Sequence, residues 1–169
     1  MDNLLLASLL HPTKADVAFS NGWRYGAPVA TGPITMNDLW NIIPTNPPVS
    51  TVNLTGREII DMMEASLEAV FAADPYNQMG GYVKRCLVMT LFVKLENPPG
   101  TRIQVAFIQG KEIEPDETYH TAFVTVQGVP KMYGTDRHNL SLHAIDALRQ
   151  YIEKHEVVAP ILQGTIQVV

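Results

Sequence analysis

Residues 49–60 read VSTVNLTGREII, and they contain the clearest local signal in the chain. Val49 to Leu54 has the composition of a β-strand. Thr55 follows as a helix N-cap, and Glu58 stands three residues later, where its side chain can reach back to the Thr55 amide in a capping box. The stretch therefore predicts a strand that turns directly into a helix.

Apolar residues recur at helical spacing after this turn, and they predict that the helix ends before Asp74. The stripe consists of Ile59, Met63, Leu67, Val70 and Phe71. Further strands are expected at residues 16–20, 83–95, 102–108, 119–126 and 165–169. Further helices are expected at the N-terminus, at 36–43, and along a last stripe of Leu142, Ile145, Leu148 and Ile152.

These elements predict one α+β domain over residues 1–169, with a mixed β-sheet and about three to four helices. Strands outnumber helices, and regular crossovers do not separate them. Residues 44–48 read PTNPP, which cannot form regular structure. A rigid loop of this kind is a place where a site can lie.

Composition excludes several classes of function. The net charge is −5 and no run of Lys and Arg occurs, so we expect no duplex nucleic acid as a partner. No apolar run approaches the ~18 residues of a spanning helix, so we expect no membrane partner. A single cysteine, Cys86, allows no disulfide within the chain.

The motifs of a complete catalytic apparatus are absent from the sequence. None of the five histidines forms a pair at helical i, i+4 spacing, and no nucleophile elbow or phosphate-binding P-loop occurs. We therefore expect no metal ligands and no catalytic residues in this chain.

Three loops carry possible ligand-binding chemistry. Residues 20–26 read SNGWRYG directly after a strand, and Arg24 there can fork onto a phosphate, sulfonate or carboxylate, with Trp23 as a flat neighbour. Residues 74–81 read DPYNQMGG and form a second polar and aromatic loop. Phe123, near a strand end and followed by Gln127 and Gly128, is the third candidate. Each candidate has a structural alternative. Arg24 can pack on Trp23 at the surface, the 74–81 loop can be a helix stop that leads into a hairpin, and Phe123 can be a core aromatic.

Four segments, in this order, resemble the C-terminal domain of 5'-nucleotidases across almost the whole chain. They read ADVAFSN at 15–21, GPIT at 32–35, VNLTGREI at 52–59 and PDETY at 115–119. The resemblance implies an N-terminal metallophosphoesterase domain that holds two divalent metals, such as manganese or zinc, and activates a water. We expect that domain to lie outside these 169 residues, and this chain alone to be inactive. Members are usually exported, which implies a periplasmic or extracellular location.

By the same resemblance, this domain holds a nucleotide or related phosphate ester and carries it to the metals. Asn21 and Arg24 fall on the family residues at the anionic or sugar end of the substrate, and Phe123 falls on one of two aromatics that sandwich the base. The other aromatic is replaced by Thr45, and the family's base-reading Asp by Val129. Each missing stack removes ~1–3 kcal/mol, so the departures count against ordinary nucleotide specificity.

Two motifs resemble another branch, the thiosulfohydrolases of the Sox sulfur-oxidation pathway. They are the 20–26 loop and the 74–81 loop, which contributes Tyr76 and Gln78 and is followed by Arg85. Those enzymes use manganese and cleave sulfate from a thiosulfonated cysteine on a carrier protein. Phosphate-ester hydrolysis remains the first hypothesis, a thiosulfohydrolase-like substrate the second, and a stand-alone binding module the third.

Overall fold

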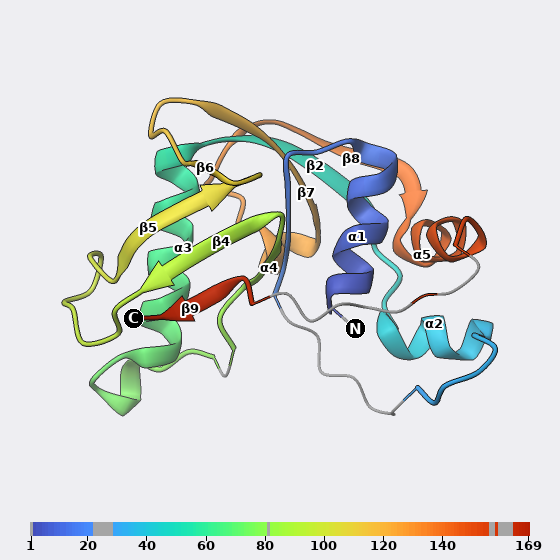
Figure 1. The fold of residues 1–169 in the computed structure, drawn as a ribbon, viewed down its shortest axis with the longest axis horizontal. Coiled ribbons are helices and arrows are strands. Elements are labelled where there is room, and N and C mark those ends of the chain that lie inside the picture. Colours follow the sequence, from blue (N-terminus) through green and yellow to red (C-terminus); the bar gives the residue numbers. More distant parts are fainter. Residues whose placement is uncertain (1, 22–28, 81, 156–157, 159–163) are drawn as a thin grey trace.

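The computed structural model describes residues 2–21, 29–80, 82–155, 158 and 164–169, and it places their strands in two sheets (Figure 1). The first sheet has the order β3-β1-β7-β2-β8. Its strands are β3 (Arg85–Leu87), β1 (Val17–Ser20), β7 (Thr118–Val124), β2 (Pro48–Thr55) and β8 (Thr135–His143). Strands β1 and β7 run parallel, and the other neighbours are antiparallel.

The second sheet has the order β6-β5-β4-β9 and is also mixed, because β4 and β9 run parallel. Its strands are β6 (Lys111–Glu112), β5 (Ile103–Ile108), β4 (Met89–Val93) and β9 (Ile166–Val168). The predicted α+β class with mixed strand directions is confirmed, although the strands form two sheets where one was expected.

Five α-helices and one 3₁₀ turn accompany the sheets in the described part of the chain. They are α1 (Asp2–Thr13), α2 (Met36–Ile42), α3 (Gly56–Phe71), α4 (Thr125–Gly128), α5 (Ala144–Glu153) and η1 (Pro75–Asn77). No helix among the described residues is long and apolar enough to span a bilayer.

The stretch at residues 49–60 forms the predicted strand, cap and helix. The Thr55 hydroxyl accepts from the Glu58 amide at 3.2 Å, and the Glu58 carboxylate accepts from the Thr55 amide at 2.8 Å. Gly56 is required between them, because a Cβ there would lie 2.2 Å from the Glu114 carbonyl oxygen. Close backbone approach therefore locks this turn onto the segment that leads into β7.

Two hydrophobic cores lie on opposite faces of the first sheet, as strand alternation requires. Phe19 and Leu54 face α3 and the second sheet, whereas Ala18 and Val49 face α1, α2 and α5. Figure 1 shows α3 beside the second sheet and the helices α1, α2 and α5 gathered on the other side. The first sheet is thus covered on both faces, and its strand ends are left for a site.

The prediction of one strand at residues 83–95 was wrong. The segment is β3 and β4, which belong to different sheets and are separated by Val88 alone. Val88 has φ of 69°, a left-handed conformation that is rare for a β-branched residue. Val88 lies within an unbroken apolar run from Cys86 to Met89, so the pattern contained no sign of the turn.

The C-terminal half also differs from expectation. Strand β8 was not predicted, and it includes Leu142, which the sequence pattern had assigned to the last helix. Most β8 residues are exposed on this edge strand, so no buried alternation marks it. The strand predicted at 119–126 ends at Val124, where α4 begins.

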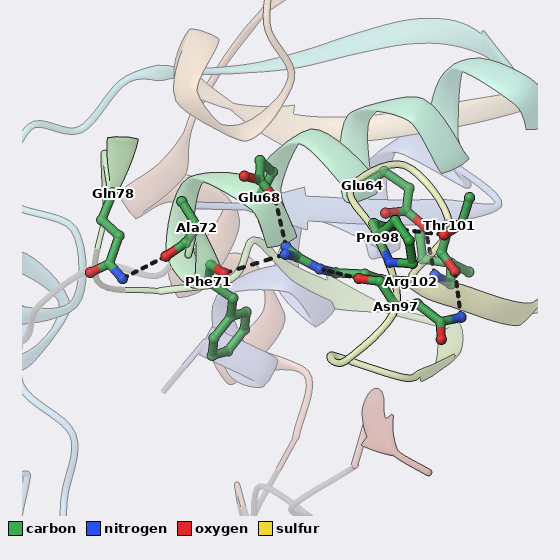
Figure 2. A network of polar contacts seen from close by, with 10 residues as sticks. Glu64, Glu68, Phe71, Ala72, Gln78, Asn97, Pro98, Thr101 and Arg102 are labelled. Atoms are coloured by element: carbon green, nitrogen blue, oxygen red, sulfur yellow. Dashed lines mark hydrogen bonds and ion pairs between the residues drawn. The ribbon is translucent and has the colours of Figure 1, made fainter. Parts of the chain in front are cut away.

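A polar network joins the C-terminal turns of α3 to the second sheet (Figure 2). Arg102 is 5% exposed, and its guanidinium donates to the carbonyl oxygens of Phe71 and Asn97, both at 3.3 Å. Arg102 Nη1 also forms an ion pair with Glu68, whose carboxylate oxygen lies 2.8 Å away. Glu64 accepts from the Ile103 amide at 2.6 Å. The network fixes the helix end against β5.

Candidate functional site

The carboxyl ends of β1 and β7 lie side by side, because these strands are parallel neighbours with Phe19 opposite Phe123. Asn21 follows β1 directly, and the short helix α4 follows β7. Ligands of sheets with parallel strands commonly bind just beyond such carboxyl ends. The topology therefore brings together the first and third loops that the sequence singled out.

Hydrogen bonds join the residues at this edge. Asn21 Nδ2 donates to Gln127 Oε1 at 2.8 Å, and the Lys84 ammonium donates to the Gln127 carbonyl oxygen at 2.6 Å. Asn21 Oδ1 is buried and has no hydrogen-bond partner among the described residues. Lys84 is 9% exposed, and burial lowers its pKa to about 8. No sequence pattern indicated Lys84, and the segment after Phe123 gave no sign that Gln127 would contact Asn21 and Lys84, because these contacts span chain segments far apart.

Arg85 lies at the same edge, one strand further out. It pairs with Ser20 across β3 and β1, so it is adjacent in the sheet to the start of the 20–26 loop. Its side chain is 46% exposed and reaches within 4.0 Å of the Asp2 carboxylate. Trp23 and Arg24, the other candidates of that loop, lie outside the described residues.

Tyr76 and Gln78 follow α3 and make no described contact with Asn21 or Arg85. Tyr76 is 95% exposed, whereas the Gln78 amide donates to the Ala72 carbonyl oxygen at 3.0 Å (Figure 2). Gln78 thus fixes the path of its own loop, and Tyr76 presents its ring to solvent. Their predicted binding roles remain predictions.

Phe123 is 2% exposed, and the Arg137 guanidinium carbon lies 4.8 Å from the centre of its ring. One side of this residue packs in the core shared with α3, so its ring offers no open face in this structure. Val129, at the family's base-reading position, is fully buried, and its carbonyl oxygen accepts from Arg137 at 3.1 Å. Stacking of a ligand on Phe123 would require Arg137 to move.

A pocket with a volume of about 250 Å³ opens beside Phe123. Its described lining is Pro47, Pro48, Ser50, Phe123, Thr125, Val126, Lys131, Arg137 and Asn139. The proline-rich loop at 44–48 therefore does form the wall of a candidate site. The polar lining residues on β8 and near it were not found from the sequence, because the segment TDRHN at 135–139 has no motif.

Arg137 is held by backbone carbonyl oxygens. It donates to Val129, to Pro130 at 3.0 Å and to Tyr133 at 3.0 Å, and no ion pair joins it to a carboxylate among the described residues. Burial lowers its pKa from the ordinary arginine value, yet a guanidinium remains charged in proteins. The pocket is therefore next to a rigid positive charge.

The described residues contain no cluster of three His, Cys, Asp or Glu side chains that could hold a metal. They bring together groups that can bind a ligand, namely cations, amides and a hydroxyl, at strand ends.

Residues 1–126 match the family model of the 5'-nucleotidase C-terminal domain. The chain belongs to this family. The family resemblance drawn from the sequence motifs is thereby confirmed.

Two curated relatives match the chain. It is 25% identical over 119 residues to Endonuclease YhcR of Bacillus subtilis, covering 70% of this chain and 9% of the relative. It is 22% identical over 164 residues to the 5'-nucleotidase of Vibrio vulnificus, covering 94% of this chain and 28% of the relative. The chain thus spans less than a third of the length of either relative.

Solved structures show the same fold. The sulfate thiohydrolase SoxB of Thermus thermophilus superposes with a TM-score of 0.85 at 22% identity, covering 99% of this chain and 31% of that one. A 5'-nucleotidase precursor from Thermus thermophilus has a TM-score of 0.79 at 20% identity, covering 99% and 34%. The structural neighbours therefore include both kinds of protein that the sequence motifs resemble, the 5'-nucleotidases and the thiosulfohydrolases.

Proposed function

We propose that this chain is the substrate-binding domain of a dinuclear-metal hydrolase that acts on nucleotides or related phosphate esters. The observation that carries the proposal is the cluster of Asn21, Lys84, Arg85 and Gln127 at the carboxyl ends of β1 and β7. An exposed cation, Arg85, and a buried one, Lys84, at such a place favour an anionic substrate. Membership of the 5'-nucleotidase family supports the same reading.

The described residues do not fit a metal site, so we place the two metals, manganese, zinc or a similar pair, in another domain. There they would activate a water. The role of this chain is to hold and orient the substrate, which lowers the entropic part of the barrier. By family membership we also propose a periplasmic or extracellular location, which fractionation of the source cells would test.

One observation favours a second candidate, a thiosulfohydrolase-like domain that acts on a thiosulfonated carrier protein. A nucleobase clamp needs an open aromatic face, and here Phe123 is covered by Arg137 while Val129 is fully buried. Thr45 supplies no aromatic ring on the other side. A sulfonate group on a peptide requires neither ring.

The test is performed on the protein as purified from its source, whose intact mass is measured first. With manganese or zinc, its hydrolysis of AMP, of a simple phosphomonoester and of an S-sulfonated peptide is then compared. Arg24→Ala should lower kcat/KM at least tenfold on the preferred substrate, while the exposed Arg57→Ala serves as the matched control. Hydrolysis of none of the three substrates would reject the proposal and favour a non-catalytic binding module.

A further inference from the structure

Five of the nine described residues that line the pocket beside Phe123 have a side chain that can donate a hydrogen bond, and the other four are apolar. Arg137 and Lys131 are cations, and none of the described lining residues is a carboxylate. The Ser50 hydroxyl donates to Asn139 Oδ1 at 2.8 Å, which leaves the Asn139 amide hydrogens available. A lining of this kind is complementary to a ligand that only accepts hydrogen bonds.

Thr125 adds a second, independent sign of a ligand. Its φ is 64°, a left-handed conformation that is an outlier for a β-branched residue. Its hydroxyl oxygen is buried without a hydrogen-bond partner among the described residues, yet the residue lines the pocket. A strained backbone and an unsatisfied polar group each cost stability, and such features cluster at functional sites.

Arg137 is positioned with donors left over. A guanidinium has five N–H groups, and three hydrogen bonds to the carbonyl oxygens of Val129, Pro130 and Tyr133 leave two. The same bonds hold it over the Phe123 ring, where a stacked base would otherwise lie. The pocket, at about 250 Å³, is also smaller than the ~300–1,000 Å³ of sites for drug-sized ligands.

We propose that this pocket binds a non-aromatic oxyanion of the sulfate, sulfonate or phosphate type in place of a nucleobase. Arg137 and Lys131 supply the charge, and Thr125 and Asn139 donate hydrogen bonds. This inference rests on the proposed function, because it names the chemical group that the substrate-binding domain holds at that position. The oxyanion is either free or part of a modified peptide.

The first experiment is an NMR titration of the 169-residue chain with sodium sulfate, an S-sulfonated cysteine peptide and adenosine. Sulfate should shift the Arg137 Nε–H signal and the amides of 125–139, and adenosine should shift neither. Tighter binding of the peptide than of sulfate identifies a peptide-borne group, and the reverse identifies a free oxyanion. Adenosine shifts at Phe123, or no shift with either oxyanion, would overturn the inference.

Variants then assign the binding to this pocket. Lys131→Ala should weaken oxyanion binding at least fivefold, and Thr125→Val, which keeps the branched shape and removes the hydroxyl, should weaken it severalfold. Lys111→Ala is the matched control, because Lys111 is also exposed and does not line the pocket. Equal losses in the two lysine variants would mean unspecific charge attraction and would reject the site.

The inference and the proposed function can fail separately. If the source enzyme hydrolyses AMP and Lys131→Ala leaves its kcat and KM unchanged, the pocket assignment is wrong and the domain's role stands. If the chain binds sulfate at Arg137 and the source protein hydrolyses nothing, the pocket is real and the hydrolase proposal is wrong.

Discussion

Arg102 and Arg137 are two arginines held by backbone carbonyl oxygens, and they differ in one respect. Arg102 has a carboxylate partner, Glu68, at 2.8 Å, with Glu64 bound to the next residue along β5. Arg137 has only carbonyl oxygens as hydrogen-bond partners among the described residues, its guanidinium lies over the Phe123 ring, and it lines a pocket. A buried charge that is neutralised within the protein holds elements together, whereas one that is fixed and left without a counter-ion is suited to an external anion.

The largest effect should follow from breaking the neutralised charge. Arg102→Met removes the ion pair and leaves the carboxylates of Glu64 and Glu68, near the end of α3, without the Arg102 charge beside them. We expect the free energy of unfolding to fall by about 3 kcal/mol, the lower end of the range for broken buried pairs, since Glu68 is 38% exposed. Urea denaturation measures this, and sulfate binding by the folded variant should be unchanged. A loss of binding without a loss of stability would contradict the structural role of Arg102.

Arg137→Met should show the opposite result, with a small loss of stability and a large loss of sulfate binding. Three hydrogen bonds to carbonyl oxygens are lost at a half-buried position that water can reach, so stability should fall by about 1–2 kcal/mol. Sulfate binding should weaken at least tenfold, and adenosine should begin to bind because one face of Phe123 is uncovered. Unchanged sulfate affinity in this variant would remove Arg137 from the binding site.

Lys84 extends the same comparison, because its ammonium group is buried and has no carboxylate partner among the described residues. Its pKa is lowered to about 8 from 10.5, so between these values the unfolded chain binds more protons than the folded one. Stability must therefore rise with pH above about 8, by roughly 1 kcal/mol up to pH 9. The Cys86 thiol, whose pKa burial raises from 9.0 to about 11, contributes with the opposite sign as the pH approaches 9 and above it, because the thiol of the unfolded chain then ionises, so it offsets part of this rise.

In Lys84→Met the rise between pH 8 and 9 should disappear. Urea denaturation at pH 7, 8 and 9 measures it, with Lys111→Ala as the control that keeps the rise. A pH profile of Lys84→Met that matches the parent chain would mean that another group titrates in this window.

The smallest effect is expected at the exposed pair of Arg57 and Asp116, which lie 3.6 Å apart with side chains 66% and 95% exposed. Solvent screens such a pair almost completely. Asp116→Asn should leave the urea midpoint unchanged within error and sulfate binding intact. A measurable loss of stability in Asp116→Asn would show that the degree of burial does not explain the difference between this pair and the pair of Arg102 and Glu68.

The elements that were predicted correctly are those whose signals are local. Thr55 and Glu58 define a cap within four residues, and the helix after it needs only its own periodicity. Strand β8 and the turn at Val88 escaped prediction because neighbours in other strands, rather than their own sequence, determine them.

The residues of the site also fall into two groups, those that motifs in the sequence mark and those that only the fold brings together. Asn21, Arg85 and Phe123 could be named because family motifs mark them, and the sheet brings their strands together. Lys84 and Gln127 are 43 residues apart and Asn21 and Gln127 are 106 apart, so no spacing rule relates them. The carbonyl oxygens that hold Arg137 come from residues four to eight positions earlier in the chain, but no sequence motif marks their geometry, and the Phe123 ring beneath the guanidinium is brought there by the fold.

Val88 has a mechanical consequence. It is the one residue between β3, which carries Arg85 at the site, and β4, which lies in the other sheet. A connection this short provides no slack, so a displacement of the Arg85 backbone towards a bound ligand is transmitted to β4 and its partner strands. Amide hydrogens of β3 and β4 should therefore exchange with solvent as one cooperative unit, and ligand occupancy at one sheet should be detectable as slower exchange in the other.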